Sequence, residues 1–155
     1  MSDLSFRIAA AIAILAFLLT ATAGVALVRK SPSTGRQFIR IVQEEVVGKI
    51  DAHEPFSLAV FIFFNNLQAC VLLFLGGVTL GVLTLFIISS NGILIGGILE
   101  LVREERGPLY VAAAILPHGI FEIPSFVLAA ALGFILGTSL LSEWRGEGDS
   151  AGAAR

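Results

Sequence analysis

Long runs without charge are the feature that most limits what this chain can fold into. Residues 8–28 (IAAAIAILAFLLTATAGVALV) carry no charged side chain, and between Phe56 and Val102 the only charge is Glu100. A third apolar run, 109–141, contains one glutamate and one histidine. Only 14% of the residues are charged, against about 25% in soluble domains. Because so few charges cannot cover a soluble surface, the sequence predicts an integral membrane protein.

The first two runs predict three membrane spans. At about 1.5 Å per residue, residues 8–28 cross the ~30 Å hydrocarbon core as one helix. A cleaved signal peptide is the alternative for this run, but its apolar region is usually only about 7–15 residues long, so we expect a retained helix. The second run is too long for one span. The stretch LGGVTLG (75–81) divides it into helices near 57–75 and 78–101.

The polar stretch between the first two runs predicts an amphipathic helix at about 36–51. Its apolar residues recur every four positions, at Phe38, Val42, Val46 and Ile50. Oppositely charged residues at i,i+4 spacing occupy the other side. We expect this helix to lie at the bilayer surface, either as a connector or as a docking site for a partner.

The third run is interrupted by LPHGIFEIP, residues 116–124. A single helix over the whole run would be about 50 Å long, which is more than one plain span needs. Pro117 and Pro124 each remove a backbone donor, and Gly119 loosens the turn between them. We therefore expect a half-helix, a broken or re-entrant segment near 117–124, and then a span.

Ionisable groups within this interruption predict an interior polar cluster. His118 and Glu122 are four residues apart and share a face if the segment is helical. Intramembrane ionisable groups are costly and usually face the bundle interior with a partner. Asn65, Asn66 and Asn91, from the other predicted spans, can add hydrogen bonds. The cluster is either a structural staple between helices or a site for a proton, an ion or a small polar solute.

Paired glycines predict close helix contacts. Three pairs have Gly-x-x-x-Gly spacing, which lets another backbone approach one helix face: Gly77 with Gly81, Gly92 with Gly96, and Gly133 with Gly137. Packing within one chain and packing between two copies both satisfy this pattern. Gly24 has no such partner in its run, so we expect it to tolerate alanine.

The order of several motifs resembles the stage II sporulation protein M family. FFNN (63–66) is followed by GGVTLGVLTLFIISSNGILIGG (76–97), LPHGIFEIP and GFILG (133–137). The resemblance covers about 56–140 and implies a polytopic helical membrane protein. Sporulation in that family is remodelling of membrane and cell wall during engulfment, alongside partner proteins.

Other functional classes lack the residues that they require. The ten Lys and Arg residues form no continuous basic face, so we expect no nucleic-acid partner. A catalytic zinc site needs about three protein ligands, and His118 with Glu122 supplies two, so we expect no metal and no cofactor. A catalytic Ser–His or paired-Asp pattern and the lysine of a phosphate-binding loop are also missing, which argues against an enzyme.

We therefore predict an all-α polytopic membrane helical bundle with about four spans. A single integral membrane domain should cover 1–141, and the polar tail 142–155 should be disordered. We expect a multi-pass protein of the plasma membrane, whose partners are the lipid bilayer and either further copies of the chain or other membrane proteins. The predicted function is a non-enzymatic scaffold for membrane remodelling or complex assembly. The alternative is a transporter or an ion- or proton-conducting protein that uses the site around His118 and Glu122.

Overall fold

The computed structural model describes residues 3–33, 35–37, 40 and 55–146. Every element within this part of the chain is helical, which confirms the all-α prediction. The elements are α1 (Asp3–Lys30), α3 (Pro55–Leu75), the short 3₁₀ helix η1 (Gly76–Thr79), α4 (Val82–Arg106) and α5 (Pro108–Trp144). The ranges predicted for the first three spans overlap α1, α3 and α4, and α4 begins and ends a few residues later than predicted.

Length and apolarity make this bundle a membrane structure. Three helical stretches are long and apolar enough to cross a bilayer, namely Ser5–Lys30, Val82–Arg106 and Gly119–Trp144. A shorter apolar stretch, Phe63–Thr79, covers most of α3 and η1. Large apolar side chains such as Phe86 are exposed on the outside of the bundle. Lipid can cover such side chains, whereas water cannot cover them without a cost, so the membrane helical bundle is confirmed.

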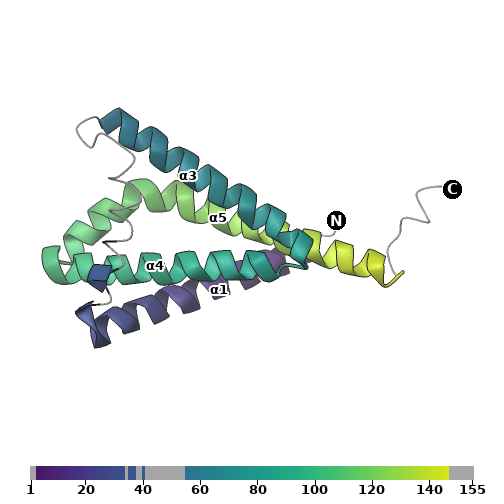
Figure 1. The fold of residues 1–155 in the computed structure, drawn as a ribbon, viewed down its shortest axis with the longest axis horizontal. Helices are drawn as coiled ribbons and strands as arrows, with labels where there is room; N and C mark the ends of the chain where they lie inside the picture. Colours follow the sequence, from purple (N-terminus) through teal and green to yellow (C-terminus); the bar gives the residue numbers. More distant parts are fainter. Residues whose placement is uncertain (1–2, 34, 38–39, 41–54, 147–155) are drawn as a thin grey trace.

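The four long helices run in two directions (Figure 1). Helices α1 and α4 run the same way and pack most closely with each other. Helices α3 and α5 run the opposite way, and α5 lies between α3 and the α1–α4 pair (Figure 1). As a consequence, α3 forms an outer edge of the bundle and leaves much of its surface uncovered.

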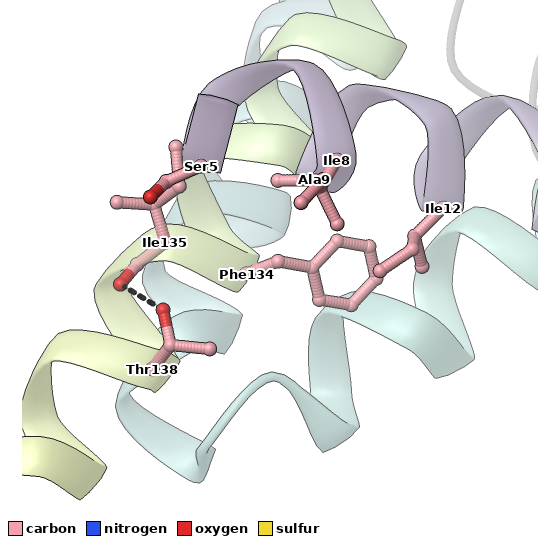
Figure 2. A pocket seen from close by; sticks show the side chains of 7 residues that line it. All are labelled: Ser5, Ile8, Ala9, Ile12, Phe134, Ile135 and Thr138. Carbon is pink, nitrogen blue, oxygen red and sulfur yellow. Dashed lines mark hydrogen bonds between the residues drawn. The ribbon is translucent and has the colours of Figure 1, made fainter. Parts of the chain in front are cut away.

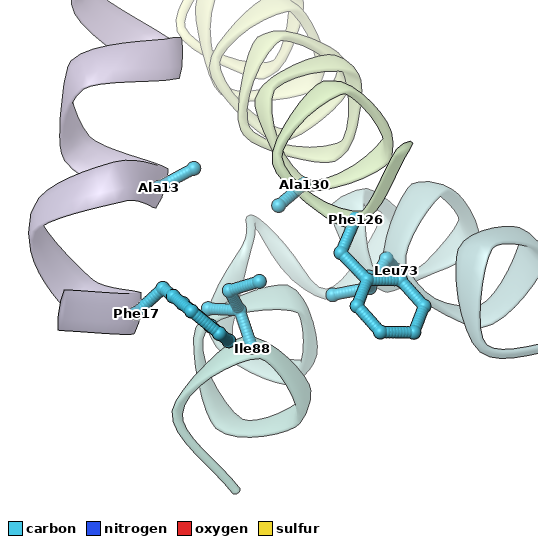
Figure 3. Packing of buried hydrophobic residues seen from close by; sticks show 6 residues of the cluster. All are labelled: Ala13, Phe17, Leu73, Ile88, Phe126 and Ala130. Atoms are coloured by element: carbon cyan, nitrogen blue, oxygen red, sulfur yellow. The ribbon is translucent and has the colours of Figure 1, made fainter. Parts of the chain in front are cut away.

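The core lies where the four long helices meet (Figure 3). Each of them contributes at least one fully or almost fully buried apolar side chain. The cluster comprises Ala13 and Phe17 of α1, Leu73 of α3, Ile88 of α4, and Phe126 and Ala130 of α5. Two small alanines among larger side chains allow the helix axes to approach closely at this level.

The predicted division at 75–81 is a tight turn. Helix α3 ends at Leu75, and two left-handed residues, Leu80 with φ 56° and Gly81 with φ 85°, precede α4. Thr79 Oγ1 accepts a hydrogen bond of 2.9 Å from the backbone N–H of Leu83 and so satisfies a donor in the first turn of α4. Gly77 and Gly81 therefore belong to the turn, and the expectation that they share one helix face is wrong.

The expected break near 117–124 is also wrong. Helix α5 is continuous over 37 residues, Pro108–Trp144, and it bends in its first part (Figure 1). Pro117 and Pro124 remove one backbone donor each, and this bends a helix without ending it when the neighbouring hydrogen bonds persist.

The structure describes only parts of the predicted polar tail and of the predicted amphipathic helix. Helix α5 runs to Trp144, so the first residues of the predicted tail are helical, and 147–155 lie outside the described residues. Of the predicted amphipathic helix, 36–37 and 40 are helical, and the remainder lies outside the described residues. That helix stays a prediction.

Candidate functional site

Glycines allow the backbones of α1 and α4 to come into direct contact. A Cβ atom on Gly24 would meet the carbonyl oxygen of Ile93 and would lie 2.9 Å from the backbone nitrogen of Gly97. A Cβ on Gly96 would meet the carbonyl oxygen of Ala21 and would lie 2.7 Å from its carbonyl carbon. Backbone atoms cannot move aside as a flexible side chain does. The expectation that Gly24 tolerates alanine is therefore wrong.

The close contact between α1 and α4 continues one turn further along the two helices. A Cβ on Gly92 would meet Thr20 Oγ1 and would lie 2.8 Å from the carbonyl oxygen of Phe17. Thr20 Oγ1 donates a 2.7 Å hydrogen bond to the carbonyl oxygen of Ala16, so its hydroxyl is satisfied within α1. We call the contact formed by Gly24, Gly92 and Gly96 the α1–α4 seam.

A second close contact joins α5 to α3 and to the start of α4. A Cβ on Gly133 would meet the carbonyl oxygen of Leu73 and would lie 2.7 Å from Thr84 Oγ1. Thr84 is fully buried and donates a 2.8 Å hydrogen bond to that same carbonyl of Leu73. Gly137 faces the turn, where a Cβ would lie 2.8 Å from the backbone nitrogen of Gly81. Both glycine pairs that lie on long helices thus pack within the chain.

A buried carboxylate ties the ends of α1 and α4 together. Glu100 is only 3% exposed, and its Oε1 accepts a 2.7 Å hydrogen bond from Arg29 Nε. Arg103 donates from Nε to Glu100 Oε2 at 2.8 Å and from Nη2 to Oε1 at 2.7 Å. The Arg29 and Arg103 side chains remain 60% and 43% exposed, so their charges reach the surface while the carboxylate stays inside.

Sequence reasoning missed the role of this ion-pair network. The sequence shows Glu100 as the only charge in a long apolar run and Arg103 one turn later, which is a signal for a local pair. Arg29 lies 71 residues earlier in the chain, and only the pairing of α1 with α4 brings it to Glu100.

The predicted polar cluster is only partly covered by the described residues. Glu122 is half-buried on α5, whereas the side chain of His118 lies outside the described residues. Asn91 donates from Nδ2 to the carbonyl oxygen of Ile87 at 2.9 Å, one turn earlier on its own helix. Asn91 thus donates one hydrogen bond within α4, and the contact between His118 and Glu122 stays a prediction.

The two neighbouring asparagines of α3 point in different directions. Asn66 is half-buried, and it lies seven residues before the buried Leu73 and four before Cys70, which packs on the core. Residues at these spacings share a helix face, so Asn66 is on the inner face of α3. Asn65 is exposed. Of the two, Asn66 is the residue placed to reach a polar group on α5.

An apolar cavity of about 300 Å³ lies between the start of α1 and the last third of α5 (Figure 2). It is lined by Ser5, Ile8, Ala9, Ile12, Phe134, Ile135 and Thr138. Thr138 Oγ1 donates to the carbonyl oxygen of Ile135 at 2.9 Å, so its hydroxyl is engaged within α5. Such a lining suits an apolar group more than a polar substrate.

Across the described residues, no three His, Cys, Asp or Glu side chains are grouped closely enough to hold a metal ion.

Comparison with known proteins agrees with the membrane fold. The profile of the stage II sporulation protein M family matches residues 13–155. The chain belongs to this family. The match includes the α1–α4 seam, the ion-pair network of Glu100 and the α5 contacts with the turn, so these features lie within the family region of this stage II sporulation protein M homologue.

Two uncharacterized proteins of Methanocaldococcus jannaschii are similar to part of the chain. One is 36% identical over 74 residues, which cover 47% of this chain and 42% of that protein. The other is 35% identical over 81 residues, which cover 52% of this chain and 34% of that protein. The matched part is thus less than half the length of either relative. No solved structure matches the chain.

Proposed function

We propose that the protein is a multi-pass scaffold of the plasma membrane that supports membrane remodelling or the assembly of a membrane complex, without catalysing a reaction. The observation that carries this proposal is the α1–α4 seam together with its ion-pair network. Helices in backbone contact at Gly24 and Gly96, and tied at one end by Glu100, form a rigid pair. A rigid pair suits a surface on which other proteins dock.

Family membership supports the same role. The stage II sporulation protein M family resemblance implies remodelling of membrane and cell wall alongside partner proteins. The helix predicted at 36–51 would offer a docking element at the bilayer surface. Multi-pass insertion is supported by α1, α4 and α5, which are long and apolar enough to cross, and α3 is the shorter helix that we propose as the fourth span.

Transport of a proton, an ion or a small solute is the second candidate. The half-buried Glu122 on α5 and the inner-face Asn66 on α3 favour it, because carboxylates at such depth often mark ion pathways. This candidate needs a hydrated path and a change of packing between helix groups. The α1–α4 seam would have to move as one body in such a change.

A complementation experiment separates the two candidates. In cells that lack the gene, we expect the wild-type protein and the His118→Ala/Glu122→Gln variant to restore the envelope morphology equally, as measured by electron cryotomography. Gly96→Leu, at a matched membrane level, should not restore it, because the leucine would push α1 away from α4. The reverse pattern would favour transport and overturn the scaffold.

A flux assay gives an independent test. Liposomes that contain the purified protein should dissipate an imposed pH gradient no faster than empty liposomes. A faster proton flux that disappears in the folded His118→Ala/Glu122→Gln variant would replace the scaffold proposal with the transport proposal.

A further inference from the structure

Two amide side chains lie exposed at the middle of α3. Asn65 is the central residue of this 21-residue helix, and Gln68 follows it by one turn. Both are exposed on the surface of the bundle, next to the exposed Leu72. Positions i, i+3 and i+7 share a helix face, so Asn65, Gln68 and Leu72 form one line, which we call the amide strip.

The amide strip is exposed on the flank of α3, beside the face that packs on the rest of the bundle. Leu73 and Cys70 of α3 pack on the core and on α5, and they define the inner face of the helix. Helix α3 is at the outer edge of the bundle (Figure 1), so another molecule can approach the strip. Neither Asn65 nor Gln68 makes a side-chain hydrogen bond to any described residue.

An amide without a partner is unfavourable in hydrocarbon. Water is absent at the centre of a bilayer, so each donor and acceptor there needs a protein partner. Asn and Gln side chains meet this need by bonding across helices. If α3 crosses the bilayer over its whole length, Asn65 at its middle lies at the depth where lipid offers no substitute.

We propose that the amide strip binds the amide strip of a second copy of this chain within the membrane. A carboxamide carries both donors and an acceptor, so it is complementary to itself. A two-fold axis brings the same residues of two copies face to face, and Asn65 and Gln68 then satisfy each other across the interface. The uncharged strip requires no oppositely charged partner. This inference rests on the multi-pass placement proposed above.

Cysteine cross-linking in liposomes tests the face that is used. In a Cys70→Ser background, Leu72→Cys lies in the amide strip, and Leu67→Cys is the matched control on another exposed face of α3. The parent leucines are exposed by 42% and 47%, so both cysteines are accessible. On mild oxidation, we expect several-fold more covalent dimer from Leu72→Cys than from Leu67→Cys. Equal yields, or no dimer from either, would overturn the proposal.

Removal of the amides tests the chemistry of the contact. The Asn65→Leu/Gln68→Leu variant should become monomeric in a photobleaching count in liposomes while keeping its melting temperature, because both sites are exposed. Asn66→Leu, on the inner face, should leave the dimer intact. A monomeric wild-type protein, or a double variant that stays dimeric, would refute the self-association.

One further measurement distinguishes a lack of self-association from an error in the proposed membrane placement of α3. Asn65→Cys in the same background should resist a water-soluble maleimide in intact liposomes. Rapid labelling would show that the middle of α3 is in water, which would overturn the multi-pass placement and the inference with it. Slow labelling without dimers would overturn the self-association alone.

Discussion

At the scale of single residues, Gly24 shows how a close contact can be invisible in the sequence. The glycine pattern on one helix predicts a contact only when two glycines share that helix. Gly24 is alone on α1, and its partners are the backbone atoms of Ile93 and Gly97 on α4. The paired glycines Gly92 and Gly96 signal that a helix will approach, but they do not say which residue of that helix will meet them.

We predict that Gly24→Ala destabilises the protein. The added methyl group would overlap the carbonyl oxygen of Ile93, and overpacking of this kind costs about 1–3 kcal/mol. A lower melting temperature in detergent is the expected result. Ala23→Val is the control, since this neighbouring side chain is exposed and should change the melting temperature little. Similar melting of Gly24→Ala and the wild type would contradict the backbone contact.

Glu100 makes a second prediction at this scale, because its network is asymmetric. The carboxylate is buried, whereas Arg29 and Arg103 are largely exposed. Removing the carboxylate leaves two arginines that water can solvate. Removing both arginines leaves a buried charge without a partner, and this costs about 3–5 kcal/mol.

The Arg29→Gln/Arg103→Gln variant should therefore be less stable than Glu100→Gln. Thermal melting in detergent at neutral pH measures the difference. Lys30→Gln, at the neighbouring exposed position, controls for the loss of a surface charge. If Glu100→Gln proved the more damaging change, the burial of the carboxylate would not be what makes the network important.

At the scale of the elements, the sequence predicted three of the long helices and the turn at 75–81, but it did not predict a continuous α5. Two prolines usually end a helix in water, where free carbonyl groups bind water. In a bilayer, an irregular segment at 117–124 would expose several backbone groups, whereas a bent helix loses only the donors of Pro117 and Pro124. The bend is therefore the less costly solution, and it could not be distinguished from a break by the spacing of the prolines alone.

We therefore predict that Pro124→Ala is tolerated or stabilising. The substitution restores one backbone donor to α5, and Pro124 is exposed, so no packing is lost. A proline in a helix interior costs about 3 kcal/mol, so the gain can reach about that size. Circular dichroism and thermal melting should show unchanged helicity and an equal or higher melting temperature. Ser125→Ala is the exposed control, and a clear loss of stability in Pro124→Ala alone would mean that the bend itself is needed for packing.

At the scale of the whole molecule, the candidate sites depend on contacts between distant segments. The pair of Arg29 and Glu100 forms only because α1 and α4 run side by side in the same direction (Figure 1). Sequence patterns predict which face of a helix is apolar, but they do not predict which helix covers that face. The membrane class could thus be predicted from the uncharged runs, whereas the α1–α4 seam and its ion-pair network required the fold.

The continuous α5 also decides the expected topology. If α1, α3, α4 and α5 each cross the bilayer once, as proposed above, the number of crossings is even, and both ends of the chain lie on one side. The start of α1 and the end of α5 do lie at the same end of the bundle (Figure 1). The opposite end carries more positive charge within the described residues: Arg29, Lys30, Arg36, Arg40, Arg103 and Arg106, against Arg7 and Arg145 at the end with the termini.

The positive-inside rule then places the end with more arginines in the cytoplasm and both termini outside. In a Cys70→Ser background, a membrane-impermeant maleimide added to whole cells should label Glu143→Cys and should not label Ser33→Cys until the membrane is opened. Both parent residues are exposed, so a lack of labelling reports the side of the membrane and not burial. Labelling of Ser33→Cys alone would invert the orientation, and labelling of both from outside would mean that the number of crossings between them is even. When α3, α4 and α5 each cross once, an odd number of crossings separates Ser33 from Glu143, and the two sites lie on opposite sides. This one experiment therefore tests the orientation and the four-span arrangement together.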